Sequence, residues 1–163
     1  MPPRSAGILL YRRRGGALEV LLVHPGGPFW KSRDDGAWMI PKGGVEEGEA
    51  ASACALREFE EELGSRPAGT PWPLCTVRQK GGKLVEAFAL EGDLDPAAIV
   101  SNSFRLEYPP RSGLYREFPE VDAAAWYGLS EARTKILPSQ APILNALEAA
   151  LGGAEPPGRR DDA

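Results

Sequence analysis

The stretch "GGVEEGEAASACALREFEEELGS", residues 43–65, joins a glycine-rich loop to closely spaced glutamates, which fill four of the five positions 58–62. A helix is expected here, with Glu49 as a favourable anion in its first turn and Gly64 as its C-terminal stop. Like charges three and four residues apart destabilise a helix by about 0.2–0.5 kcal/mol per pair. The charge is therefore either tolerated on a solvated face or balanced by a bound cation.

Helical spacing groups the glutamates by direction. Glu58, Glu61 and Glu62 fall within roughly 100° of one another, which is one face of the helix. Small residues are predicted on the same side, where they leave open space around the carboxylates: Ala51, Cys54 and Ala55. The remaining expected positions are a core stripe of Ser52, Leu56, Phe59 and Leu63, and a solvated Glu60.

Two readings of this acidic face compete. A solvated surface helix is the first, because charged residues are mostly exposed. Between Val45 and Glu62, however, there is no lysine and only one arginine, Arg57, so the alternating charges of a solvated helix are missing. Clustered carboxylate oxygens are the ligands that Mg²⁺ or Mn²⁺ prefers. The pattern favours a divalent metal site.

The same stretch resembles the signature of the Nudix hydrolases, the MutT-like pyrophosphohydrolases: G-x5-E-x7-R-E-U-x-E-E-x-G-U, where U is a bulky apolar residue. The matching positions are Gly43, Glu49, Arg57, Glu58, Phe59, Glu61, Glu62 and Gly64. Only Ser65 departs from it, at the final U, and this concerns packing after the helix. The resemblance implies a Nudix hydrolase domain over residues 5–151, of the α/β class, with a mixed sheet in an α/β/α sandwich.

The resemblance also implies roles for the helix residues. Members of the family are typically metal-dependent hydrolases of a nucleoside diphosphate linked to another group. The ligands it implies for Mg²⁺ or Mn²⁺ are Glu58, Glu61 and Glu62, with the Gly43 carbonyl as a further one. Arg57 would orient Glu58 or Glu49; an ordinary surface ion pair, which contributes little to stability, is the alternative.

A base is expected outside the helix, because family members often take one from the loop before a late strand. The corresponding residues are 116–126, which offer Glu117 and Glu120. Glu120 is preferred because it precedes Trp126 by six residues, a spacing that resembles the family's loop-to-strand transition. Two exposed rim glutamates are the alternative, in which case Glu61 is the expected base.

Three further residues are candidates for substrate binding. "WMIPKG", residues 38–43, resembles a segment of the family's diadenosine-polyphosphate and diphosphoinositol hydrolases. It implies a phosphate contact for Lys42, although an exposed loop lysine is the alternative. Trp38 is a candidate that core packing would equally explain. Arg78, in the basic hairpin of residues 78–83, is expected to touch phosphate or to lie in a solvated turn.

Composition limits the wider possibilities. A chain of 163 residues with 42% hydrophobic and 26% charged residues is typical of one globular domain. No run of about 18 apolar residues exists, so no membrane partner is expected. The net charge of −4 disfavours nucleic acid as the main partner. Two cysteines indicate a reducing cytoplasm rather than a disulfide framework. The sequence leaves the oligomeric state open, a homodimer included.

Local patterns predict the remaining elements. Short strands are expected at 6–11, 18–23, 37–41, 74–79, 83–90 and 123–128. Asp95 and Pro96 are expected to begin a short helix, and Ser130 to cap another. A last helix is predicted from the apolar stripe Ile143, Leu144, Leu147 and Leu151. His24 is assigned to a turn, residues 101–120 to irregular structure, and residues 152–163 to a disordered tail.

These features together predict a cytoplasmic Nudix hydrolase that cleaves a phosphoanhydride in a nucleoside polyphosphate. A diadenosine polyphosphate, or another dinucleoside polyphosphate, and a nucleoside triphosphate are the leading substrates. The alternative is a Nudix-fold module that senses a nucleotide without turnover; the complete set of box glutamates disfavours it. The sequence does not fix the number of metal ions.

Overall fold

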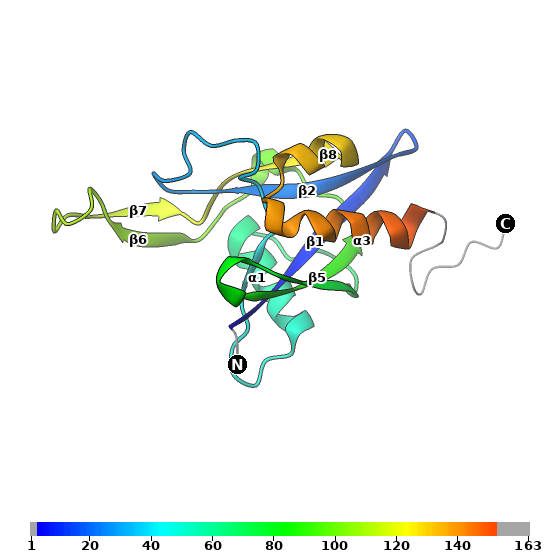
Figure 1. Cartoon of the computed structure of the whole chain (residues 1–163), viewed down its shortest axis with the longest axis horizontal. Helices are drawn as coiled ribbons and strands as arrows, with labels where there is room; N and C mark the ends of the chain where they lie inside the picture. The colour runs from blue at the N-terminus through cyan, green and yellow to red at the C-terminus, as the bar shows by residue number, and fades with distance from the viewer. Residues whose placement is uncertain (1–2, 153–163) are drawn as a thin grey trace.

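A six-stranded mixed sheet forms the centre of the computed structural model, which describes residues 3–152 (Figure 1). Its strands are β1 (Arg4–Arg14), β2 (Ala17–Pro25), β3 (Lys42–Gly44), β4 (Trp72–Arg78), β5 (Leu84–Glu91) and β8 (Val121–Gly128). They lie in the order β4-β5-β1-β2-β8, and β3 pairs with β1. Only β1 and β5 pair in parallel; the other pairs are antiparallel. The predicted mixed sheet is confirmed.

Helices cover both faces of this sheet. Alternate residues of β1 point to opposite sides, so Ile8 and Leu10 pack with α1 (Ala51–Leu63), whereas Leu9 and Tyr11 pack with α3 (Ala141–Gly152). The α2 helix (Leu129–Lys135) contributes to the α3 side, and α3 crosses in front of the sheet in Figure 1. The predicted α/β/α sandwich is confirmed. Three short 3₁₀ segments complete the helices among residues 3–152: η1 (Lys80–Gly82), η2 (Pro96–Ala98) and η3 (Pro138–Gln140).

Several predicted elements are confirmed in detail. The first two strands and the β4–β5 hairpin form as expected. Asp95 begins a short helix, because its Oδ1 accepts a hydrogen bond from Ala97 N at 3.0 Å. The predicted stripe of the last helix is buried. No helix among residues 3–152 has both the length and the apolar character needed to cross a bilayer.

The prediction for residues 101–120 was wrong. This stretch forms a hairpin of β6 (Ser103–Glu107) and β7 (Tyr115–Pro119), which projects from the body of the molecule (Figure 1). The alternation of Phe104, Leu106 and Tyr108 is a strand pattern. Pro109 and Pro110 obscured it, although they lie outside the two strands, in the connection between them.

Some predictions for short segments and single residues differ from the structure. In the predicted strand 37–41 only Trp38 and Met39 form isolated bridges, and regular pairing begins at Lys42. Ser130 does not cap α2, which begins at Leu129 after Gly128. His24 is buried in β2, where Nδ1 lies 2.8 Å from Asp122 Oδ1 and Nε2 lies 2.6 Å from Arg33 O. Of the predicted tail only Gly152 is described, as the last residue of α3; residues 153–163 lie outside the described part.

Candidate active site

The α1 helix carries the acidic face, and its ends form locally. Gly64 adopts a left-handed conformation (φ 85°), and its N–H donates to Glu60 O at 2.8 Å, as predicted for the C-terminal stop. The helix begins at Ala51, so Glu49 precedes Ala50 at the N-cap and does not occupy the first turn. The prediction for Glu49 is corrected accordingly: its carboxylate binds Arg57 instead.

The packing of α1 also corrects the predicted surroundings of the glutamates. Cys54 and Ala55 are fully buried against the sheet beside Phe59 and Leu63, so they belong to the core rather than to open space. The Cys54 thiol lies 3.5 Å from Gly43 O. Close packing of these small residues lets α1 approach β3, and this proximity brings the carboxylates to the edge of the sheet.

The acidic face opens into a pocket of about 420 Å³. Four carboxylates line it, three from α1 and one from the segment between β7 and β8: Glu58, Glu61, Glu62 and Glu120. Two lysines line it as well, Lys42 from β3 and Lys83 from the segment before β5. Glycine backbone and apolar side chains complete the lining: Gly43, Gly44, Val23, Pro25, Met39 and Val121.

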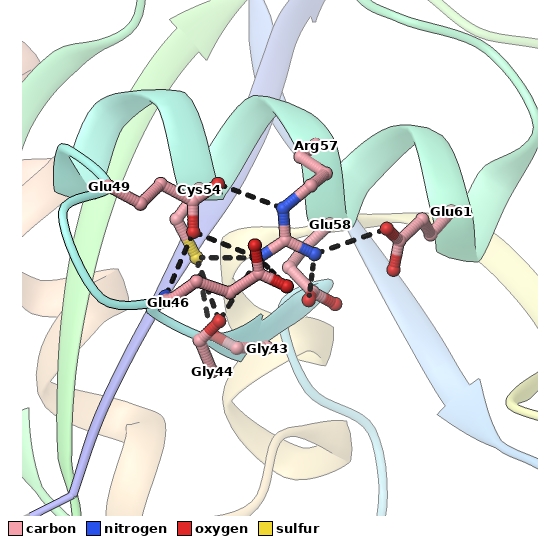
Figure 2. Close-up of polar contacts among 8 residues, drawn as sticks. All are labelled: Gly43, Gly44, Glu46, Glu49, Cys54, Arg57, Glu58 and Glu61. Carbon is pink, nitrogen blue, oxygen red and sulfur yellow. Dashed lines mark hydrogen bonds and ion pairs between the residues drawn. The ribbon is translucent and has the colours of Figure 1, made fainter.

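Arg57 fixes the orientation of three glutamates (Figure 2). Its Nε donates to Glu49 Oε2 at 2.8 Å, and its Nη1 donates to Glu58 Oε2 at 2.9 Å and to Glu61 Oε2 at 3.1 Å. Its Nη2 donates to Gly44 O at 3.1 Å, which ties the helix to β3. The hydrogen bonds from Arg57 lower the pKa of Glu49 to about 2. Arg57 thus contacts both partners expected for it, and Glu61 besides.

Gly43 is required by the position of Glu58. A Cβ added at residue 43 would lie 2.0 Å from Glu58 Cδ, far inside van der Waals contact. The same addition at Gly44 would meet nothing within 4 Å. The absence of a side chain at residue 43 therefore makes room for the Glu58 carboxylate beside the strand backbone.

Burial and like charge oppose ionisation of these carboxylates. Burial raises the pKa of Glu62 to about 8; the Lys42 charge opposes this rise, and Glu120 and Glu58 add to it. Burial, followed by the charge of Glu61, also raises the pKa of Glu58 and of Glu120. Burial and then Lys83 lower the pKa of Lys42. A cation bound among the carboxylates would relieve their mutual repulsion.

The donor set fits a hard divalent cation in type and in location. Carboxylate oxygens and a backbone carbonyl are the ligands such ions take. In the described residues, no three histidine, cysteine, aspartate or glutamate side chains already stand in a coordinating arrangement. Arg57 holds oxygens of Glu58 and Glu61. Arg57 occupies only Oε2 of each residue, so Oε1 of Glu58 and Oε1 of Glu61 are the oxygens that it leaves to an ion.

Some of the other residues predicted to act as a base or to bind substrate line the pocket, and others do not. Lys42 and Glu120 line the pocket, whereas Glu117 lies on β7, opposite Arg105 in the register of the hairpin. Trp38 is only 8% exposed and packs in the α3-side core, and its indole Nε1 donates to Asp34 Oδ1 at 2.8 Å. Trp38 does not line the pocket.

Arg78 is also outside the pocket and donates to Gly82 O at 3.3 Å. The cation that the pocket takes from this hairpin is Lys83, which sequence reasoning missed. Its placement follows from pairing: Ser5 of β1 is in register with Val85 on one side and with Gly44 on the other. The sequence signal for Lys83 was its place in the basic hairpin of residues 78–83, from which Arg78 was chosen as the phosphate contact instead.

Comparison with known proteins gives a family. The sequence model of the NUDIX domain matches residues 1–147. An octanoyltransferase of Myxococcus xanthus is 30% identical over 135 residues, which are 83% of this chain and 33% of that protein. An RNA pyrophosphohydrolase of Rhodospirillum rubrum is 39% identical over 70 residues, 41% of each protein. The chain therefore spans less than half the length of these curated relatives.

Solved structures agree on the fold. The NUDIX domain of Shewanella oneidensis NrtR, complexed with ADP ribose, superposes with a TM-score of 0.65 at 19% identity, covering 93% of this chain and 89% of that one. A C. elegans Ap4A hydrolase in a binary complex gives a TM-score of 0.63 at 22% identity, covering 93% of this chain and 98% of that one.

Proposed function

This chain belongs to the NUDIX domain family, and from that premise we propose that it is a divalent-metal-dependent hydrolase that cleaves a phosphoanhydride bond in a nucleoside polyphosphate. The observation that carries the proposal is the pocket itself, which joins a cluster of carboxylates to two lysines. Such a site suits a cation together with a polyanionic ligand, because the acidic part alone would repel phosphate. Residues 5–151 are proposed as the catalytic domain.

Glu58, Glu61 and Glu62, with the Gly43 carbonyl, are the proposed ligands of Mg²⁺ or Mn²⁺. When bound, such an ion would neutralise the diphosphate and lower the pKa of a water molecule. Arg57 orients Glu58 and Glu61 through the hydrogen bonds described above. This arginine is charged at all ordinary pH values, so it remains a hydrogen-bond donor to both carboxylates.

The two lysines are proposed to bind the substrate, and Glu120 to activate the water. Lys42 and Lys83 would bind phosphate oxygens as point charges. In the hydrolytic step a water oxygen bonds to phosphorus, and the bridging oxygen departs with the electron pair of the broken bond. Glu120 is proposed to accept the proton of that water, since burial and Glu61 raise its pKa toward the range useful for a base. Glu61 is the alternative base. Trp38 and Arg78 keep no proposed role, because neither lines the pocket.

The relatives support a pyrophosphate bond as the point of cleavage, since the RNA pyrophosphohydrolase shares 39% identity over its matched segment. A dinucleoside polyphosphate or a nucleoside triphosphate, deoxynucleotides included, is the proposed substrate. The match to the octanoyltransferase covers a third of that protein, so no transfer activity is proposed from it. A nucleotide-sensing module is the alternative; the presence of Glu58, Glu61 and Glu62 in one pocket favours turnover.

A substrate screen tests the proposal. The purified protein would be incubated with diadenosine polyphosphates, nucleoside and deoxynucleoside triphosphates, each with Mg²⁺, with Mn²⁺ and with a chelator, and the products separated by chromatography. Cleavage of at least one class, abolished by the chelator and restored by the ion, is expected. Binding of a nucleotide without any cleavage would favour the sensing module instead, and undiminished turnover in chelator would exclude the proposed mechanism.

A further inference from the structure

The β6–β7 hairpin, residues 103–119 and called the arm below, is attached to the wall of the pocket. At its base Asn102 N donates to Glu61 O at 2.9 Å, and Glu120 N donates to Asn102 O at 2.8 Å. Gly26 N, from the loop after β2, donates to Glu120 O at 3.0 Å. The arm therefore starts beside one proposed ligand and ends at the proposed base, and it projects outward from there (Figure 1).

One face of the arm is aromatic. Phe104 pairs with Phe118 across the hairpin, with ring centroids 6.1 Å apart, and Tyr108 lies 6.2 Å from Phe118. Phe29, from the loop after β2, meets Tyr108 edge-on at 6.1 Å. The aromatic cluster is thus Phe29, Phe104, Tyr108 and Phe118. Phe29 is the most exposed member of the cluster, with 58% of its surface accessible, and the other three rings are half-buried.

The arm also carries cations without carboxylate partners. Arg116 lies over the Phe118 ring at 5.6 Å, on the aromatic face, and Arg105 lies over Tyr115 at 4.3 Å, on the other face. Among residues 3–152, neither arginine forms an ion pair with a carboxylate. In a chain of net charge −4, arginines without ion pairs beside partly exposed aromatic rings are suited to a ligand that carries both a ring and negative charge.

The distances along β7 match a single nucleotide. A strand advances about 3.3 Å per residue, so Phe118 lies about 7 Å and Arg116 about 13 Å along the chain from Glu120. A nucleotide whose phosphates occupy the pocket must place its base within such a span. Within the aromatic cluster Phe29 is exposed, whereas Phe104, Tyr108 and Phe118 are half-buried, so the cluster offers partly accessible ring surface on the arm side of the pocket.

We propose that the aromatic cluster of the arm is the base-binding surface of this protein: a purine or pyrimidine ring stacks on the cluster with Phe29 as its outer wall. The proposal rests on the proposed function, because it places the nucleoside of the same substrate. It identifies a substrate with an aromatic base rather than a bare polyphosphate or a sugar phosphate. A second copy of the chain is the competing occupant of the arm.

Binding of two matched ligands by the Phe29→Ala variant tests the proposal. The ligands are α,β-methylene ADP, which has a base, and methylenediphosphonate, which has the same uncleavable bridge without one; calorimetry with Mg²⁺ present measures both. Loss of one base–aromatic stack should weaken the binding of the nucleotide roughly 5- to 150-fold. The affinity for methylenediphosphonate should stay within about twofold, and Phe29→Tyr should retain most of the nucleotide affinity.

Leu114→Ala is the control on the same arm, because Leu114 is 63% exposed and is not part of the aromatic cluster. It should leave both affinities unchanged. Unchanged nucleotide binding in Phe29→Ala, equal weakening of both ligands, or a wild-type protein that does not distinguish the two would each overturn the proposal. So would a dimer, seen by sedimentation, that both variants dissociate without altering base selectivity.

These binding measurements need no turnover, so they separate the arm from the proposed function. Hydrolysis by the wild-type protein decides the proposed function. If Phe29→Ala still hydrolyses the substrate with an unchanged KM, the arm proposal fails while the proposed function stands. If no substrate is hydrolysed but the nucleotide affinity falls only in Phe29→Ala, the cluster binds a base and the hydrolytic function fails.

Discussion

Two glutamates three residues apart, Glu117 and Glu120, allow a test of which residue is the general base that activates the water. Glu120 lines the pocket, whereas Glu117 lies out on the arm. Glu120→Gln removes the proton acceptor and should lower kcat by about 100-fold or more with little change in KM. Glu117→Gln is the matched control and should retain kcat. Steady-state kinetics at saturating Mg²⁺ measure both; full activity in both variants would assign the proton to Glu61.

The stability of the metal-free protein should depend on pH through Glu62. The folded-state pKa of Glu62 is about 8, raised by burial from its ordinary 4.5. Its stabilising contribution is therefore complete below about pH 4.5 and is lost as pH rises through 8, where folding must keep a buried charge. In metal-free protein, Glu62→Gln should gain stability relative to wild type over this range. Denaturant unfolding at several pH values measures the difference.

Glu62→Gln should also lower the rate of turnover by orders of magnitude, because a neutral amide binds a divalent ion much more weakly than a carboxylate does. A merely solvated glutamate would give the opposite pair of results: no pH-dependent difference in stability, and normal turnover. The two readouts together therefore separate a buried ligand from a surface charge.

Lys83 provides the third test. It lines the pocket near Lys42, whereas Lys80 of the same hairpin is exposed and does not line it. Lys83→Ala should raise KM about tenfold through loss of one phosphate contact, with a change in Tm of only about a degree or two. Lys80→Ala should leave KM unchanged. Equal effects of the two substitutions would indicate that positive charge on the hairpin attracts the phosphate at long range, without a direct contact from Lys83.

At the scale of elements, the contact between β3 and α1 depends on one missing side chain. Gly43→Ala would put a methyl group 2.0 Å from Glu58 Cδ, whereas Gly44→Ala meets nothing within 4 Å. The Glu58 carboxylate can swing aside, so the loss of Mn²⁺ affinity should exceed the loss of thermal stability. Mn²⁺ titration followed by electron paramagnetic resonance, with Gly44→Ala as control, measures this; equal affinities in the two variants would remove Glu58 from the ligand set.

Elements defined by local signals were predictable from sequence. The α1 helix has a glycine stop and a spaced set of glutamates, and the first two strands flank a glycine turn. The arm was missed because two prolines outweighed a short alternating pattern. Lys83 was missed for a different reason: its position depends on the pairing of β5 with β1, which joins residues about 80 apart in sequence. Local patterns carry no information on such pairing.

The sequence predicts poorly which side chains of the site are buried. Cys54 and Ala55 were expected beside open space and are in the core, because α1 lies closer to the sheet than the helical projection alone could indicate. The same close approach buries Glu62, and thereby raises its pKa. The tertiary contact thus changes the chemistry of a residue whose identity and spacing were evident from the sequence.

Across the fold, the pocket draws on β2, β3, α1, the residue before β5 and the start of β8, which are far apart along the chain. An ion bound there links α1 to β3 only in the folded protein, so it should raise Tm by mass action. An ion at about 100 times its Kd adds about 2.7 kcal/mol to the free energy of unfolding, which for a chain of this size corresponds to a rise in Tm of about 5–10 °C.

The rise in Tm should be larger at pH 8 than at pH 6, because the ion must displace the proton that Glu62 holds below its folded-state pKa of about 8. Thermal scans with Mn²⁺, with an equal ionic strength of Na⁺ as control, measure the rise, and Glu62→Gln should lose most of it together with its pH dependence. A rise that Na⁺ reproduces, or that Glu62→Gln retains in full, would mean that the ion acts by general screening of the acidic surface and not at this pocket.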